Sequence, residues 1–354
     1  MLGIDRNAAR YTWTAAAVMV LMFLFYLVRK TLFVFILALL FAYLLSPLVN
    51  LLYRALPGRT RAPALALAYV IFVGLVVVMG LQIGSRVVNQ AKELARNLPA
   101  DMEKWEKPSP DLSPTLNRFR SQLVRRIDQQ VSEGSSQVLS NVAEAGLKFL
   151  TVASDLVYAV IIPILAFFFL KDGAMIREHI LDLVEAGPQR VLLDDLMADI
   201  HLLLAHYMRA LVLLSLAAFT AYSIVFSILG VPYAVLLGAI AGVLEFIPML
   251  GPLTAAVIIL VVTIVAGGHT LAVLLFIVVY RVFQDYILSP HLMGQGVELH
   301  PLLVLFGVFA GAELAGIPGT FLSVPVLALI RILYVRFRRT RVGSRLTPVG
   351  PVAL

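Results

Sequence analysis

The amino-acid sequence predicts an all-α, polytopic membrane protein of about eight transmembrane helices, two of them broken or re-entrant, with amphipathic helices on the membrane surface. The first observation behind this prediction is composition: 60% of the residues are hydrophobic and only 14% are charged, whereas a soluble domain carries about 25% charged residues. The second is that the charges are segregated, which leaves several apolar windows of the length of about 20 residues that a span needs. The third is a pair of apolar segments that are each interrupted by Gly, Pro and one carboxylate.

The apolar segments follow one another along the chain, separated by short basic loops or by longer polar stretches. Arg29-Lys30 closes the first segment, and a Pro-Gly loop with three arginines follows the second. Residues 231–267 are too long for one straight crossing, so a break is expected there. The predicted spans are residues 12–28, 31–53, 63–84, 149–170, 207–229, 231–267, 269–288 and 301–333.

Two stretches of mixed charge are predicted to lie outside the bilayer. Residues 85–148 contain ten basic and eight acidic residues, and within them Ser113-Pro114 is typical of a helix start. Residues 175–204 alternate acids with apolar residues and are interrupted at Gly187-Pro188, which predicts two amphipathic helices on the membrane surface. An amphipathic helix is also expected after Ser113-Pro114, from the helical spacing of Leu116, Phe119, Leu123, Ile127 and Val131.

The two interrupted segments share a pattern. The first carries Gly238 and Gly242 before Glu245 and Ile247-Pro248, and the second repeats a GxxxG step, a carboxylate and an Ile-Pro pair. A carboxylate inside a membrane span costs roughly 3 kcal/mol on insertion scales, and a helix break frees backbone groups that need protein or water partners. Non-helical backbone within the bilayer is expected at Pro248, Gly251-Pro252 and Pro318-Gly319. Two such segments point to a transporter's substrate site; the alternative is a pair of ordinary kinks. The second copy comprises Gly307, Gly311, Glu313 and Ile317-Pro318.

Ionisable residues inside apolar segments are the candidate site residues, because such groups usually face a bundle interior and mark transport or proton pathways. Glu245 and Glu313 are expected near the bilayer midplane, where a carboxylate could take up and release a proton. Glu245 also precedes Pro248 by three residues, at the end of a half-helix where freed carbonyls gather. The GxxxG glycines are predicted to serve close helix packing. The full candidate set is Glu245, Glu313, Arg281, Asp285, Pro248, Gly251, Pro252, Pro318, Gly319 and Arg209.

Three of these candidates also have structural explanations. Arg281 and Asp285 lie four residues apart, on one helix face, and are close enough to pair. Arg209 lies near the end of a span and could reach the interface by extending its side chain.

Basic residues predict the topology and the division of the chain. Lys and Arg in short loops stay in the cytoplasm, so the arginines near both ends and in the loop 54–61 predict cytoplasmic termini, with the insertion on the far side. The net charge of +7 reflects this bias, and no nucleic-acid partner is expected. Five regions follow: N-terminal membrane helices (1–84), a soluble or interfacial helical insertion (85–148), a membrane helix plus surface helices (149–206), a C-terminal transport core (207–336) and a basic tail (337–354).

Sequence motifs for enzymatic chemistry are absent. The chain has no P-loop, HExxH motif, dinucleotide-binding glycine motif, nucleophile elbow or EF-hand loop. It also has no cysteine, which excludes a disulfide framework and a cysteine nucleophile. His201 and His206 are five residues apart and do not share a helix face. We therefore expect no enzyme, no cofactor and no metal site.

Several motifs resemble the autoinducer-2 exporter (AI-2E) family, a bacterial inner-membrane family of permeases. The resemblance covers most of the chain and is strongest from Tyr207 onward. It implies a multi-pass inner-membrane exporter of an autoinducer-2-like signal molecule, with a role in quorum sensing. The motifs are Phe169-Leu170-Lys171-Asp172-Gly173, Gly230-Val231-Pro232-Tyr233-Ala234, Phe246-Ile247-Pro248-Met249-Leu250-Gly251-Pro252, Ser289-Pro290, Leu299-His300-Pro301-Leu302 and Gly316-Ile317-Pro318-Gly319.

The chain departs from the family pattern at two places. Ala210-Leu211 stand where the family usually has Gly-Gln, and the Asn often seen near Tyr286-Ile287 is missing. If those positions touch the solute, the cargo differs here. Because some similar proteins are sodium/proton antiporters, the resemblance does not fix the substrate.

The sequence thus predicts a secondary transporter that exports a small polar solute across a lipid bilayer, with H⁺ or Na⁺ as a coupling ion and a homo-oligomer as the assembly. One alternative is a sodium/proton antiporter that uses the same acids. The other is a non-transporting membrane scaffold, whose insertion and surface helices recruit partners. Replacing the midplane acids by neutral residues separates the two classes, because a scaffold has no use for those acids.

Overall fold

The computed structural model describes residues 6–56, 61–106, 156–266, 269–293 and 299–342. Every regular element in these residues is a helix, and five helices are long and apolar enough to cross a membrane. The predicted fold class, an all-α polytopic membrane protein, is confirmed. Outside the described residues lie the helix start at Ser113-Pro114, the amphipathic stretch after it and the beginning of the predicted span 149–170.

The N-terminal helix is longer than the sequence predicts. Helix α1 (Arg6–Ala55) is one unbroken helix of 50 residues, so the prediction of two spans separated at Arg29-Lys30 is wrong. Arg and Lys are good helix formers, and two charges alone do not end a helix. Pro47 also lies inside the helix.

The predicted boundary between membrane helices and insertion at residues 84 and 85 falls within continuous helical structure. Helix α2 (Ala62–Met79) passes through one wide turn, η1 (Gly80–Gly84), into α3 (Ser85–Glu106). The glycines at the two ends of η1 accommodate a wide turn and do not stop the helix. Helix α3 therefore extends the third predicted span, and its first half packs on the core of the C-terminal region.

Helices α5 and α6 also merge elements that the sequence separates. Helix α5 (Leu156–Asp182) continues past Lys171-Asp172-Gly173. Helix α6 (Pro188–Ile228) joins the predicted surface helix to the predicted fifth span in 41 residues. The break at Gly187-Pro188 is where the sequence places it, because Pro starts a helix well and cannot continue one.

A glycine turn reverses the chain after α6. Gly230 has φ +66°; its N–H bonds the Ser227 carbonyl, and the Val231 N–H bonds the Phe226 carbonyl. This pair of bonds is the Schellman motif, which needs a left-handed residue that Gly supplies without steric cost. Phe226 and Val231 are both buried in the same apolar cluster, so the turn is fixed by packing as well.

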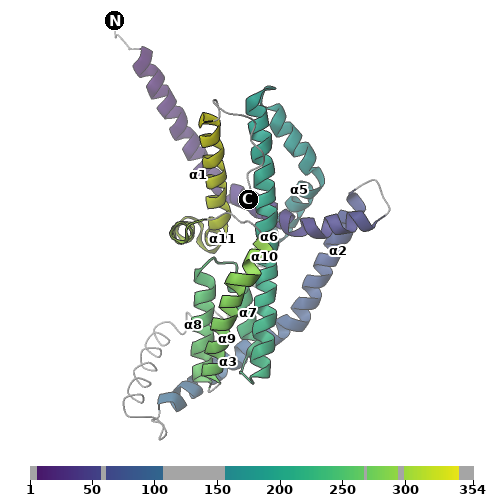
Figure 1. Ribbon diagram of the computed structural model, residues 1–354, viewed down its shortest axis with the longest axis vertical. Helices are drawn as coiled ribbons and strands as arrows, with labels where there is room; N and C mark the ends of the chain where they lie inside the picture. Colours follow the sequence, from purple (N-terminus) through teal and green to yellow (C-terminus); the bar gives the residue numbers. More distant parts are fainter. Residues whose placement is uncertain (1–5, 57–60, 107–155, 267–268, 294–298, 343–354) are drawn as a thin grey trace.

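The main apolar core lies around the C-terminal half of α6. It is formed with α7 (Ala234–Leu244), α8 (Leu250–Val265) and α9 (Thr270–Phe283), which lie together in the lower half of Figure 1. Tyr222 and Phe226 of α6 make edge-on ring contacts with Tyr280 and Phe276 of α9, with centroids 5.1 and 5.7 Å apart. The reversed order of these partners shows that α6 and α9 are antiparallel.

Helices α7 and α8 form a helical hairpin. Gly238 and Gly242 of α7 lie so close to α6 that a Cβ would collide with Ser223 or with the Ser215 carbonyl, and the Ser215 hydroxyl donates to the Gly242 carbonyl at 2.7 Å. These two glycines therefore serve close helix packing, as predicted. Because α7 and α9 both run antiparallel to α6, and only residues 266–269 separate α8 from α9, α7 and α8 run in opposite directions.

The last helix is a second hairpin. After η3 (Gln284–Leu288) and α10 (Ser289–Met293), α11 covers Pro301–Val342 but has non-helical backbone at Ala315 and Gly316. A Cβ on Gly307 would meet the side chain of Leu327, although 20 residues of straight helix would separate them by about 30 Å. The two arms of α11 therefore fold back on each other.

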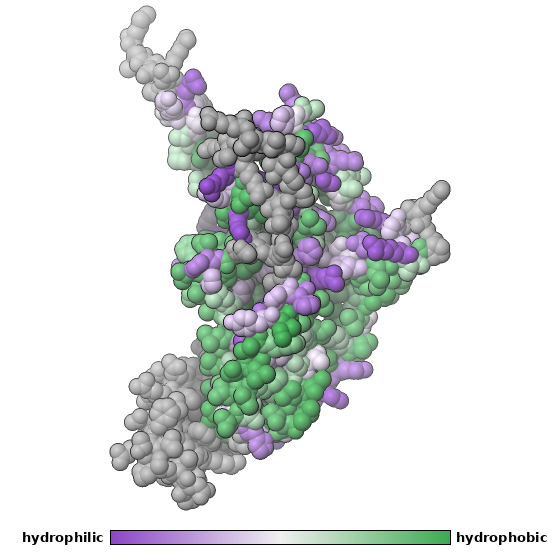
Figure 2. Space-filling view, in the orientation of Figure 1, coloured by the Kyte–Doolittle hydropathy of each residue, from purple (hydrophilic) through white to green (hydrophobic). Residues whose placement is uncertain are grey.

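The surface separates into apolar and polar parts. Figure 2 shows a largely apolar face over α8 and α9, while polar side chains gather toward the upper part, around the end of α5 and the start of α6. An apolar exterior around the C-terminal core is expected for helices that face lipid.

Candidate functional site

The hairpin of α7 and α8 ends in a short, non-helical tip. Pro248 has no N–H and biases Ile247 away from helical backbone, so α7 ends at Leu244 and α8 begins at Leu250. Met249 has φ +60° and ψ −52°, and the Leu250 N–H bonds the Pro248 carbonyl at 2.7 Å. This is the rare γ-turn with a positive φ, a strained conformation.

The break is narrower than predicted, because Gly251-Pro252 lies inside the first turn of α8. That part of the prediction is wrong: Pro is well tolerated in a first helical turn, where the N–H it lacks has no helical partner. Gly251 is required for a different reason. A Cβ there would collide with the Leu244 carbonyl oxygen at the end of α7, so Gly251 lets the two arms meet.

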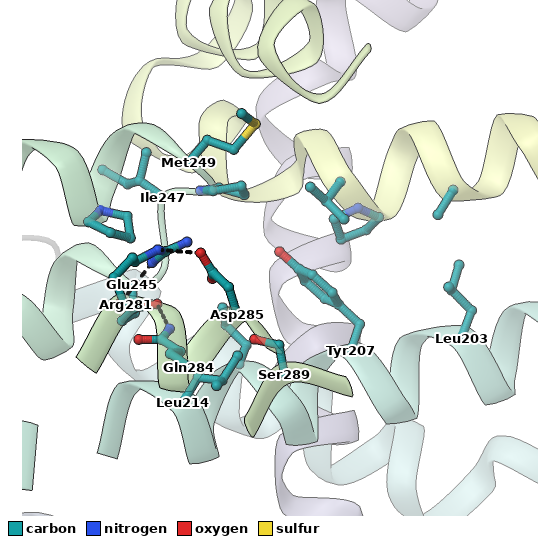
Figure 3. Close-up of a pocket in the computed structure, with 16 residues that line it drawn as sticks. Leu203, Tyr207, Leu214, Glu245, Ile247, Met249, Arg281, Gln284, Asp285 and Ser289 are labelled. Carbon is teal, nitrogen blue, oxygen red and sulfur yellow. Dashed lines mark hydrogen bonds and ion pairs between the residues drawn. The ribbon is translucent and has the colours of Figure 1, made fainter. Parts of the chain in front are cut away.

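Glu245 caps the C-terminal end of α7 and lies in a polar cluster. Its side chain is 10% exposed, and its Oε2 accepts a hydrogen bond of 2.8 Å from Gln284 Nε2. Arg281 Nη1 lies 3.8 Å from Glu245 Oε1, an ion pair too long for a direct hydrogen bond. Arg281 Nε bonds Asp285 Oδ2 at 2.8 Å, which confirms the predicted pairing of these two residues. Figure 3 shows Arg281 between the two carboxylates.

These groups line a cavity of about 270 Å³ at the junction of α6, the hairpin tip, α9 with η3 and α10, and the second arm of α11. The cavity wall is mostly apolar with a few convergent polar groups, the usual character of a small-molecule site. The lining residues are Leu203, Tyr207, Leu211, Leu214, Glu245, Ile247, Pro248, Met249, Pro252, Arg281, Gln284, Asp285, Ser289, Val324, Pro325 and Ala328.

Three buried polar atoms at this cavity have no hydrogen-bond partner among the described residues: the Tyr207 hydroxyl, Gln284 Oε1 and Arg281 Nη1. Figure 3 shows the Tyr207 hydroxyl directed toward the same space as the Asp285 carboxylate. Gln284 is only 2% exposed. Because buried polar groups without partners are costly, these atoms indicate that a polar molecule or water completes the site.

The second interrupted segment does not bring its predicted residues to the cavity. Glu313 lies on an exposed part of the first arm of α11, and Pro318 and Gly319 are helical, with the break two residues earlier. The expectation of non-helical backbone at Pro318-Gly319 is therefore wrong. Arg209 is exposed on α6 and does not line the cavity.

Sequence reasoning missed Tyr207 and Gln284. Gln284 lies three residues after Arg281, a spacing that places both side chains on one face of a helix. This spacing was the signal that could have identified Gln284. Tyr207 gave no signal that separates it from an ordinary core tyrosine. Two of the carbonyls expected to be free beside Glu245 are hydrogen-bonded: the Val243 and Leu244 carbonyls accept from the Phe246 and Ile247 N–H groups.

Metal ligands do not gather at this site. No group of three or more His, Cys, Asp or Glu side chains with metal-binding geometry occurs in the part of the chain that the structure describes. The chemistry available to the cavity is therefore hydrogen bonding and charge: two carboxylates, one guanidinium, one amide and two hydroxyls.

Fold and site together define a polytopic α-helical membrane protein with a small polar cavity at a helical-hairpin tip. The model of the family described as "AI-2E family transporter" matches residues 15–339. The chain belongs to this family, and the resemblance seen in the sequence is confirmed.

Named relatives of similar length support this assignment. The chain is 26% identical to "Putative transport protein YrrI" of Bacillus subtilis over 322 residues, which cover 90% of each chain. It is 26% identical to "Putative transport protein YueF" of the same organism, over 86% of this chain and 84% of the relative. It is also 26% identical to "Putative permease PerM" of Escherichia coli K12, over 77% and 78%.

Proposed function

We propose that this protein is a secondary transporter of the inner membrane, with both termini in the cytoplasm, that exports a small polar solute bearing several hydroxyl groups. An autoinducer-2-like signal molecule has this chemistry. The observation that carries the proposal is the cavity at the tip of the α7–α8 hairpin, where Glu245 and Gln284 are buried beside partnerless polar atoms. The family and its named relatives support transport as the activity.

The cavity suits a neutral, hydroxyl-rich solute. Gln284 Oε1 and the carboxylates of Glu245 and Asp285 accept hydrogen bonds, and the Tyr207 hydroxyl can donate or accept. Arg281 already compensates part of the negative charge, so a neutral solute leaves the local balance unchanged. The apolar wall, with Leu211 and Leu214, would exclude water from the remainder of the solute.

The test is solute flux in proteoliposomes with the Glu245→Gln variant. This change keeps an oxygen that can accept from Gln284 and removes the charge that attracts Arg281. Flux of hydroxyl-rich solutes, autoinducer-2 among them, should fall at least about tenfold, the effect of losing one charge-assisted contact. Glu313→Gln is the matched control, because the same substitution there changes an exposed residue outside the cavity. Equal flux in wild type and Glu245→Gln contradicts the proposal.

A sodium/proton antiporter is the second candidate, favoured by the two carboxylates that flank Arg281. The same vesicles separate the candidates. An antiporter dissipates a pH gradient when sodium is added in the absence of any organic solute, whereas a solute exporter does so only when its solute is present. Because the Val243 and Leu244 carbonyls already accept hydrogen bonds, a cation would depend chiefly on the side-chain oxygens of the cavity.

A further inference from the structure

An ion-pair cluster at the far end of α11 lies outside the cavity. Arg336 contacts Asp199 Oδ2 through Nε at 2.8 Å and Nη2 at 2.6 Å, and Asp195 Oδ2 through Nη1 at 2.9 Å. All three guanidinium nitrogens are therefore engaged by two carboxylates on one face of α6. Such multidentate contacts of arginine with carboxylates are among the stronger charged interactions in proteins.

The cluster is partly removed from water. The Arg336 side chain is 14% exposed and that of Asp199 is 8% exposed, while Asp195 remains half exposed. Burial of this kind costs desolvation free energy that the pairing offsets. Losing Arg336 therefore leaves the Asp199 carboxylate buried without this pairing, and losing Asp199 removes the more buried of the two ion pairs. Either change is expected to weaken the contact between the two helices at this point.

The ion-pair cluster and the cavity both lie along the line of contact between α6 and the second arm of α11, called the α6–α11 seam below. Leu203, one turn after Asp199 on α6, and Ala328, about 12 Å before Arg336 on α11, both line the cavity. Leu204 of α6 and Leu322 of α11 pack together in one apolar cluster. The seam thus runs from the ion pairs to the cavity, with the two helices antiparallel.

The second arm of α11 packs mainly against one helix. Its buried residues include Leu322, Ala328 and Ile332, whereas most of the first arm is exposed. Within the described residues, α11 packs chiefly on α6. The second arm is held mainly by its contact with α6 and, at one end, by the ion pairs of Arg336. It can therefore move away from α6 without disrupting the core around α7, α8 and α9.

We infer that Arg336, Asp195 and Asp199 form a latch that closes the cavity on the side where α11 ends, and that the latch opens to admit solute from that side. The inference rests on the proposed transport function for its role in solute movement. Whether the latch closes the cavity does not depend on the transport function, because closure determines only whether small molecules can reach the cavity. Ala328 reports that access: it lines the cavity, is 1% exposed and takes a Cys with little change in volume.

The test is the alkylation rate of Ala328→Cys by N-ethylmaleimide in purified protein, which is specific because the chain has no native cysteine. Adding Arg336→Gln or Asp199→Asn should raise the rate about tenfold, and Arg336→Lys should give a smaller rise. The double variant Arg336→Gln/Asp199→Asn should not exceed the faster single variant, because both remove the same pair. Arg338→Gln, an exposed arginine on the same helix, is the matched control and should match the parent.

An unchanged alkylation rate in both Arg336→Gln and Asp199→Asn overturns the latch. If the Arg336→Gln protein does not remain monodisperse, Asp195→Asn replaces it, because this change removes only the half-exposed contact. An unchanged alkylation rate in Asp195→Asn would then also overturn the latch. The labelling requires no solute, so it measures opening of the latch even if wild-type flux is zero for every solute tried. Faster labelling without any change in flux of the Arg336→Gln variant overturns the gating role.

Discussion

The two interrupted apolar segments share a sequence pattern, but their surroundings differ. Six of the eleven residues of α7 are buried, and the tip after it places Glu245 against Gln284 and Arg281. In the first arm of α11 most residues are exposed, and Glu313 is one of them. Gly and Pro thus dictate a hairpin in both segments through local backbone chemistry, whereas neighbouring helices decide which of the two carboxylates reaches the cavity.

The largest expected difference between the two hairpins concerns their glycines. Gly251→Ala should lower the free energy of unfolding by about 3 kcal/mol, because its Cβ collides with backbone at the end of α7. Gly307→Ala should cost only about 1 kcal/mol, since its Cβ meets the flexible end of Leu327. Thermal unfolding of the purified variants measures the order, and equal melting temperatures would show that the tip of α7 and α8 adapts as readily as α11.

The second-largest expected change in stability concerns the contact that α3 makes with the first hairpin. Gln90 Oε1 accepts the backbone N–H of Leu236, near the start of α7, at 2.9 Å. Gln90→Leu should lower the free energy of unfolding by about 1–2 kcal/mol, the cost of leaving a partly buried N–H without a partner. Gln82→Leu is the control, because Gln82 is exposed on η1 and should stay within about 0.5 kcal/mol. If the two variants unfold at the same temperature, α3 does not hold the hairpin.

The smallest effect concerns strain at the tip. Met249 holds a positive φ, which costs a non-glycine residue about 1–3 kcal/mol. Met249→Gly relieves this strain but adds freedom to the unfolded chain, so stability should change by less than about 1 kcal/mol. Met249→Ile should be less stable than both, because a β-branched side chain tolerates this backbone poorly. A melting temperature of Met249→Ile at or above that of Met249→Gly contradicts the assigned turn.

Much of the fold was predictable, because membrane spans and helix breaks depend on properties of nearby residues. The turn at Gly230, the break at Pro248 and the packing of Gly238 and Gly242 follow from glycine and proline chemistry. The errors concern helix ends. Arg29-Lys30 and Lys171-Asp172-Gly173 suggest ends of spans by their polarity, yet the helices continue, because a helix stops only where backbone geometry or packing requires it.

The candidate site was predictable only in part. The sequence singled out Glu245, Arg281 and Asp285, which the fold brings to one cavity, but it treated Glu313 as the equal of Glu245. It could not place Tyr207 beside the hairpin tip, because the contact joins residues about forty positions apart. Burial of a particular side chain is a property of the packed helices and not of the local pattern.

By itself, the sequence determined the membrane class, the position of the first helix break and the family resemblance, because hydropathy and the backbone limits of Gly and Pro act within a few residues. Only the tertiary structure decided that one of two similar acids is buried and that the other lies on the exposed first arm of α11. It also decided that Arg336 binds Asp199, 137 residues away. Such pairings depend on how whole helices pack, and many packings are compatible with the same local sequence signals.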